Sequence, residues 1–242
     1  MLGRLPGGTR IGAAVARRFA NGGYAVCICR RDAAKSQALI DELRAAGLEA
    51  HAFSVDARQE AEVQKLFAEV EKNIGPIEVC LFNAGSNVNK PLLDTTEKLF
   101  FKAWELACYG GFLVGREAAR YMLPRGRGTI FFTGATASVR GGVGFAAFSS
   151  AKFGLRAVAQ AMARELGPKN IHVAHLIIDS GVDTAWVRER FAARAGSQGQ
   201  AEPEPDQLMN PSSIAETYWQ LHTQPRDAWT HELDIRPYRE RF

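Results

Sequence analysis

An aromatic residue and a lysine stand four positions apart in the sequence Phe148-Ser-Ser-Ala-Lys152. On a helix this spacing places both side chains on the same face. A phenol at the first position could exchange a proton in step with the ammonium, a pairing that redox enzymes often use. Phenylalanine has no such proton, so the segment keeps the ammonium of Lys152 and lacks the acid.

The surrounding sequence alternates short apolar runs with amphipathic helical stretches. The apolar runs predict strands at residues 24–30, 48–56, 77–82, 128–134, 171–178 and 228–235. Helical periodicity predicts helices over about 32–46, with Asp32 as its cap, and over 63–74, 104–123 and 147–166. A further helix is predicted over 211–222, with Asn210 as its cap and Pro211 in its first turn. Repeated strand–helix–strand units indicate an α/β fold with a doubly wound parallel sheet flanked by helices.

The rhythm of these elements indicates one domain over residues 1–242. A stretch rich in Gly, Pro and acidic residues interrupts it at about 183–210, where we expect a lid-like insertion. Only Met1 to Leu5 precede the first glycine-containing turn. The first strand of such a sheet is therefore expected to be short or missing, and a truncated start is favoured because a sheet without its central strand leaves backbone groups unpaired.

Composition narrows the class of protein. The 242 residues are 46% hydrophobic and 23% charged, with a net charge of +4, which is ordinary for a globular protein and gives no reason to expect nucleic-acid binding. No apolar run approaches the ~18 residues of a membrane span and no signal sequence is evident, so we expect a cytoplasmic protein. The four cysteines have no zinc-site spacing and no metal is expected. Cys27 and Cys29 are expected to be buried free thiols on one face of a strand.

Three landmarks occur together in a characteristic order. A glycine turn opens the first helix, Asn83-Ala-Gly85 follows a mid-sheet apolar run, and Lys152 lies early in a later helix. In order and spacing, the whole chain resembles the short-chain dehydrogenase/reductase family, and specifically an atypical branch with Phe in place of the catalytic Tyr. The resemblance implies a single Rossmann-like domain that binds NAD(P) over the carboxyl ends of its strands.

The resemblance also implies a set of cofactor-binding positions. The family's glycine turn aligns with residues 5–12, where Pro6 and Arg10 replace the first two glycines and Gly12 matches the third. Arginines follow the second expected strand, where an acid would select NAD, so NADP(H) is favoured over NAD(H). The expected cofactor-binding residues are Gly7, Gly8, Arg10, Ile11, Gly12, Arg30, Arg31, Asp56, Asn83, Ala84, Gly85, Lys152, Val182 and Thr184.

The family's catalytic positions are only partly filled. Phe148 stands at the tyrosine position, Ala135 at the serine position and Ala107 at the asparagine position, whereas Lys152 matches the lysine. The lysine's contact with the nicotinamide ribose does not need the phenol. Ser138 lies nearby in sequence and is a candidate substitute for the missing serine.

Three functions remain open at this stage. The first is an NADP(H)-dependent oxidoreductase with a rearranged acid and an unknown small-molecule substrate. The second is a pseudoenzyme or sensor that binds NADP(H) without turnover, and the third is an interaction scaffold. By resemblance, a homodimer or homotetramer is expected, paired through the helices near 104–123 and 153–166.

Overall fold

The computed structural model describes residues 10–189, 192, 203–204 and 206–240. Its strands are all parallel and form two groups. A two-stranded sheet pairs β1 (Val26–Arg30) with β2 (Ala50–Ser54). A four-stranded sheet has the order β3 (Val79–Phe82), β4 (Gly128–Thr133), β5 (Ile171–Ile178) and β6 (Glu232–Ile235). Every pair of neighbouring strands is joined by a crossover, as parallel pairing requires.

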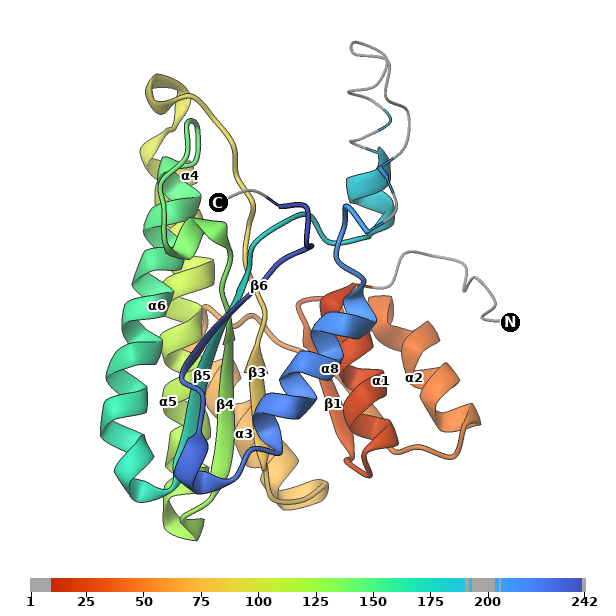
Figure 1. Cartoon of the computed structure of the whole chain (residues 1–242). Helices are drawn as coiled ribbons and strands as arrows, with labels where there is room; N and C mark the ends of the chain where they lie inside the picture. The colour runs from red at the N-terminus through yellow and green to blue at the C-terminus, as the bar shows by residue number, and fades with distance from the viewer. Residues whose placement is uncertain (1–9, 190–191, 193–202, 205, 241–242) are drawn as a thin grey trace.

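Helices cover both faces of the four-stranded sheet (Figure 1). One face packs against α3 (Glu60–Asn73), α5 (Gly110–Met122) and α6 (Ala146–Leu166), and α4 (Glu97–Trp104) lies beside α6. The other face packs against α1 (Ile11–Asn21) and α8 (Pro211–His222), and α2 (Gln37–Ala45) adjoins β2. No helix within the described residues is long and apolar enough to cross a membrane.

Two apolar cores follow from the alternation of side chains along the strands. All eight residues of β5 are buried, and its successive side chains enter opposite cores. Ile171 and Val173 face α6, whereas Ala174 and Leu176 face α1 and α8. The strand expected at residues 171–178 is therefore confirmed, and both of its faces are covered.

Several sequence expectations differ from the structure in detail. Asp32 makes no side-chain capping bond, because a short 3-10 helix over Ala33–Ser36 precedes α2. The long helix expected to continue through Trp104 and Phe112 is divided by a π-helical turn, Glu105–Tyr109. The expected burial of Cys27 and Cys29 is wrong, because Cys27 is half-buried and Cys29 is exposed, although all four cysteines are free thiols. The cap of α8 is confirmed, since the side chain of Asn210 accepts from the Ser212 amide at 2.9 Å.

Two expectations concern residues that lie wholly or mostly outside the part of the chain that the structure describes. Met1 to Leu5, where the first strand is expected to be short or missing, lie wholly outside it. Most of the insertion at about 183–210 does too, and its described ends are joined by a parallel bridge between Val182 and Met209.

Candidate active site

Lys152 lies in the second turn of α6 and points into the sheet. Its side chain is only 5% exposed, and Nζ donates to the Thr133 carbonyl oxygen at 2.7 Å. A Cβ built on Gly85 would stand 3.4 Å from Nζ, so the absence of a side chain there leaves room beside the ammonium. Burial lowers the pKa of Lys152 to about 8, because a desolvated ammonium loses its hydration. The pKa of Lys152 therefore lies much closer to neutral pH than that of an ordinary lysine.

Phe148 shares the same face of α6, as its spacing from Lys152 predicts. The centre of its half-buried ring lies 6.0 Å from Lys152 Nζ, and the ring of Phe145 packs beside it at 6.3 Å. The aromatic position therefore adjoins the ammonium in space as well as in sequence. It offers an apolar wall there and no proton.

The other catalytic positions also lack polar side chains. Ala135 follows β4, and Ala107 is 1% exposed within the π-helical turn. Ser138 is fully buried, and its hydroxyl accepts from the Ala135 amide at 3.1 Å, which closes its own turn. The hydroxyl proton is not used by that bond, so the role of Ser138 as a substitute for the missing serine stays a prediction.

A polar network that the sequence did not reveal lies behind Lys152. His175 on β5 is fully buried and its Nδ1 lies 3.0 Å from Glu232 on β6. Arg156, one turn after Lys152 on α6, binds the same carboxylate with two hydrogen bonds of 2.7 and 2.6 Å. Although burial opposes the change, the bonds from Arg156 and His175 lower the pKa of Glu232, which is therefore ionised.

Thr133 joins the two faces of the sheet at this point. Its carbonyl oxygen holds Lys152 on the α6 side, and its hydroxyl lies 2.8 Å from the hydroxyl of Tyr218 on α8. Both the Thr133 side chain and Tyr218 are buried. Lys152 is thus anchored by a residue that is itself fixed from the opposite layer.

The amino end of α1 and the segment after β3 meet at the carboxyl edge of the sheet. Gly12 lies against Asn83, since a Cβ on Gly12 would stand 3.8 Å from Asn83 Nδ2. Ile11 packs into the core, and the side chain of Arg10 is exposed at the start of the helix. Free amides at a helix start and a bare glycine fit the approach of a pyrophosphate. Gly7 and Gly8 lie outside the described residues, and Ala84 is half-buried after Asn83.

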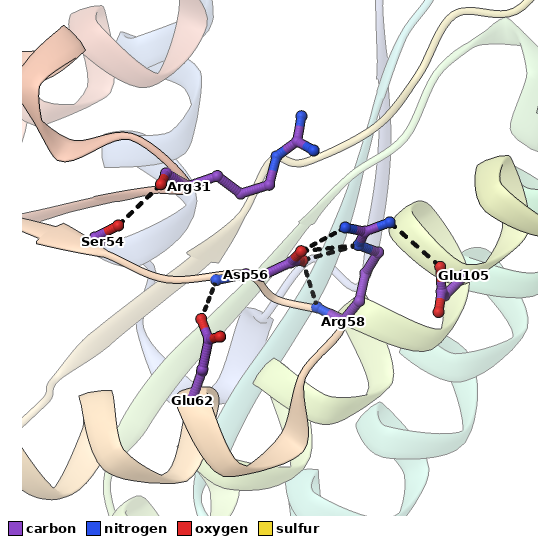
Figure 2. Close-up of polar contacts among 6 residues, drawn as sticks. All are labelled: Arg31, Ser54, Asp56, Arg58, Glu62 and Glu105. Atoms are coloured by element: carbon purple, nitrogen blue, oxygen red, sulfur yellow. Dashed lines mark hydrogen bonds and ion pairs between the residues drawn. The ribbon is translucent and has the colours of Figure 1, made fainter.

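The two arginines after β1 have different surroundings. Arg30 donates from Nη1 to the Lys35 carbonyl oxygen at 2.9 Å, which turns it toward its own loop. Arg31 instead extends its guanidinium over the edge of the sheet toward Asp56 and Arg58 (Figure 2). Its backbone oxygen accepts from Ser54 at 2.9 Å. A side-chain hydrogen bond is therefore recorded for Arg30 and none for Arg31 among the described residues, and a ligand role for either arginine stays a prediction.

Asp56 is already engaged by a neighbour (Figure 2). Arg58 Nε donates to it at 2.9 Å, and Arg58 Nη1 lies 3.4 Å from Glu105 in the π-helical turn. Hydrogen bonds from Arg58 hold the pKa of Asp56 below its usual range, so the carboxylate stays ionised. The expected adenine contact is therefore paired with a cation that the sequence alone did not indicate.

The last two expected cofactor residues lie at the start of the insertion. Val182 forms the parallel bridge to Met209. The Thr184 hydroxyl accepts from the Val187 amide at 3.3 Å and so caps a short turn. Neither residue contacts the side chains of Lys152 or Asn83 in the described hydrogen-bond pattern, so their part in the site stays a prediction.

A cavity of about 420 Å³ opens beside the turn that carries Ala135. It is lined by Thr136, Val139, Arg140, Ile177, Asp179, Glu232, Asp234 and Arg236. Thr136 donates to Asp179, which is also paired with Arg236 at 3.2 Å. Among the described residues no group of three His, Cys, Asp or Glu side chains is arranged to hold a metal ion.

Comparison with known proteins defines the class. The sequence pattern of the short chain dehydrogenase family matches residues 6–195. A 3-oxoacyl-(acyl-carrier-protein) reductase from Bos taurus is 33% identical over 168 residues, which are 69% of this chain and 70% of the relative. The 3-oxoacyl-(acyl-carrier-protein) reductase MabA from Mycobacterium bovis is 31% identical over 185 residues, 76% of this chain and 70% of that protein.

Solved structures agree with this assignment. A short-chain dehydrogenase from Rhodopseudomonas palustris is 50% identical, with a TM-score of 0.80 over 94% of this chain and 93% of that one. A variant of actinorhodin polyketide ketoreductase solved with NADPH is 25% identical, with a TM-score of 0.84 over 96% and 92%. The chain therefore belongs to the short-chain dehydrogenase family, a class of oxidoreductases. The expected Rossmann-like α/β fold is confirmed.

Proposed function

We propose that this protein is an NADP(H)-dependent oxidoreductase that reduces a carbonyl group of a small molecule with an incomplete catalytic set. The observation that carries the proposal is Lys152, buried next to Gly85 at the carboxyl edge of the sheet. The relatives named as 3-oxoacyl reductases and the NADPH-bound ketoreductase support the reaction class. The residues Phe148, Ala135 and Ala107 support the further proposal that the chain belongs to an atypical branch of the family with Phe in place of the catalytic Tyr.

The residues at the edge have separate tasks in this proposal. Lys152 holds the nicotinamide ribose, Asn83 and Gly85 lie along the adenosine ribose, and the start of α1 faces the pyrophosphate. When bound, the reduced nicotinamide supplies a hydride to the carbonyl carbon. Phe148 offers a flat apolar wall to the substrate, which favours a carbonyl carried on an apolar group. Ser138 stays the candidate substitute for the missing serine, since its hydroxyl accepts from the Ala135 amide and keeps a proton to donate.

Arg31 carries the preference for NADP(H) over NAD(H). Its guanidinium extends over the edge next to the Asp56–Arg58 pair, whereas Arg30 is bonded to its own loop. A guanidinium in this position pairs with a 2′-phosphate. Replacing Arg31 with Ser should therefore weaken NADPH binding by about 10- to 100-fold and leave NADH binding nearly unchanged. Equal losses for both cofactors would place the phosphate elsewhere, and Arg30→Ser is the matched control.

A second candidate is an NADP(H)-binding protein without turnover. The absence of a polar side chain at positions 107, 135 and 148 favours it, because proton transfer and oxyanion stabilisation each contribute about 10²-fold or more to rate. In this second candidate, Lys152 would still bind the cofactor. The interaction scaffold is a weaker alternative, since the cofactor-facing residues are retained.

The deciding experiment separates binding from turnover. NADPH binding is measured by fluorescence with the wild type and with Lys152→Met. Hydride transfer is then followed from stereospecifically deuterated NADPH to a panel of apolar ketones and imines. Binding with stereospecific transfer supports the reductase, and binding without transfer supports the second candidate. No binding at millimolar NADPH would refute both and leave the scaffold.

Self-association is proposed through the helical layer of α4, α5 and α6. This layer exposes several large aromatic side chains, namely Phe100, Phe101, Phe112 and Phe153. Exposed aromatic side chains gathered on one face are typical of interaction surfaces. Light scattering should give the mass of a homodimer or homotetramer, and Phe101→Glu should shift it toward the monomer.

A further inference from the structure

Two cations of α6 lie one helical turn apart over the sheet, and a buried histidine lies between them. Lys152 reaches the Thr133 carbonyl oxygen, and Arg156 reaches Glu232. His175 joins Glu232 through Nδ1 and lies close enough to both cations for their charges to lower its pKa. Among the described residues, the charged groups that influence the pKa of His175 are therefore Glu232, Lys152 and Arg156.

The hydrogen bond to Glu232 fixes the tautomer of His175. Because the carboxylate is ionised and held by Arg156, it can only accept, so Nδ1 carries the proton and Nε2 is an acceptor. Burial lowers the pKa of His175 to about 4, so the ring is neutral at physiological pH. Nε2 is buried and has no hydrogen-bond partner within the described structure. A buried acceptor of this kind is costly to leave unpaired.

The free nitrogen is aimed at the strand end that holds the lysine. A Cβ on Gly134 would stand 2.5 Å from His175 Nε2, and Gly134 directly follows Thr133, whose oxygen binds Lys152. Glycine at position 134 is what admits the ring here, since any side chain would collide with it. The flexible four-carbon stem of lysine lets its ammonium move between neighbouring acceptors.

We propose that Lys152 delivers the proton in this site, and that the His175–Glu232 pair is a positioning element that offers Lys152 a second acceptor and keeps it protonated. This inference rests on the proposed carbonyl reduction. A bound reduced nicotinamide would supply the hydride that forms the C–H bond at the carbonyl carbon, and the carbonyl π electrons would move to the oxygen, which becomes an alkoxide. The alkoxide takes a proton that originates on Lys152 Nζ, and the neutral amine regains a proton from solvent.

The distance from Lys152 to Phe148 sets the path of the proton. In this proposal the carbonyl oxygen lies beside the ring at about two hydrogen-bond lengths from Nζ, a separation compatible with the 6.0 Å between Nζ and the ring centre. One water molecule spans that gap, with Nζ donating to the water and the water donating to the substrate oxygen. Phe148 keeps the ring of the usual tyrosine and lacks only its hydroxyl, and in this proposal the water takes the place of that hydroxyl.

The test measures the titration of Lys152 without requiring turnover. The apo protein is treated with a limiting amount of an acylating reagent across pH 6–11, and modification of Lys152 is quantified by mass spectrometry. We expect a midpoint near pH 8 in the wild type. His175→Leu should lower that midpoint by about one pH unit, because the ammonium loses an acceptor in a buried place. His175→Gln keeps an acceptor and should stay within a few tenths of the wild type.

His172 provides a matched control on the same strand. It is equally buried but stacks on Trp229 and bonds Thr230, away from Lys152. His172→Leu should leave the midpoint unchanged. An unchanged midpoint in His175→Leu, or an equal change in His172→Leu, would overturn the positioning role. Should His175→Leu fail to fold by circular dichroism, His175→Met, which is also apolar, is measured in its place.

Turnover then tests the proton itself. The rate of ketone reduction should fall as pH rises through the labelling midpoint, and the fall should move with that midpoint in His175→Leu. A rate of ketone reduction that does not change as pH passes through the labelling midpoint of Lys152 would overturn its role as the donor. If NADPH binds and no hydride transfer is seen at any pH, the proposed function and the donor role fail together, whereas the labelling midpoints still decide the positioning role.

Discussion

Replacing Lys152 with Met should make the protein more stable while removing its activity. Burial has lowered the pKa of the lysine from an ordinary 10.5 to about 8. Each pKa unit corresponds to about 1.36 kcal/mol, so keeping the ammonium charged in the fold costs about 3 kcal/mol at pH 7. Methionine has a similar volume and no charge. It gives up the charge-assisted hydrogen bond to Thr133, which is worth about 1.5–3 kcal/mol, leaving a net gain of about 1 kcal/mol.

The pH dependence gives this prediction a specific signature. The pKa of Lys152 in the folded state lies below its value in the unfolded chain, so the unfolded chain binds more protons between pH 8 and 10.5. Wild-type stability therefore rises across that window as the folded lysine becomes neutral. The advantage of Lys152→Met should be full below pH 8 and should shrink as pH rises toward 10.5. Groups common to both proteins cancel in the difference.

Urea denaturation at pH 7 and at pH 10 measures this difference. Lys72→Met is the control, because Lys72 is an exposed lysine on α3 and should show neither effect. A variant Lys152→Met that is less stable than the wild type at pH 7 would refute the reasoning. So would an advantage that is the same at both pH values, since it would show that charge burial is not the cause.

Three further predictions test other parts of the molecule. Phe148→Tyr alone should not raise ketone reduction far above the wild-type rate, because its two partner positions remain alanine, and a large gain in a spectrophotometric assay would show that the site is wrongly assigned. Gly111→Ala should cost about 1–3 kcal/mol in a thermal melt, since its Cβ would stand 2.3 Å from Leu155, whereas Gly167→Ala has open space and should be nearly neutral. Arg58→Met should weaken NADPH binding about tenfold more than NADH binding, because it leaves the Asp56 carboxylate unpaired near the proposed 2′-phosphate position. Equal losses for the two cofactors in a fluorescence titration would contradict this.

The sequence was informative wherever the controlling interactions are local. The apolar runs gave the strands, and the four-residue spacing placed Phe148 and Lys152 on one face of α6. The cap at Asn210 followed from residue type and its neighbour Pro211. These features depend on a few adjacent residues, so a periodic pattern is enough to predict them.

The features that were missed depend on contacts between distant segments. His175 and Glu232 are 57 residues apart, so no pattern along the chain joins them. The π-helical turn consists of ordinary helix formers, and Ser138 could not be known to bond the backbone of its own turn. The pairing of Asp56 with Arg58 is close in sequence, yet which of several nearby arginines would take that carboxylate was decided by the loop geometry.

Thr133 has a consequence for how reactivity in this site can evolve. The carbonyl oxygen of Thr133 binds Lys152 in one helical layer, and its hydroxyl contacts Tyr218 in the other. A substitution in α8 can therefore shift the end of β4 that supports the amine. Substitutions in α8 can therefore change the basicity of the lysine while the residues that face the substrate stay the same.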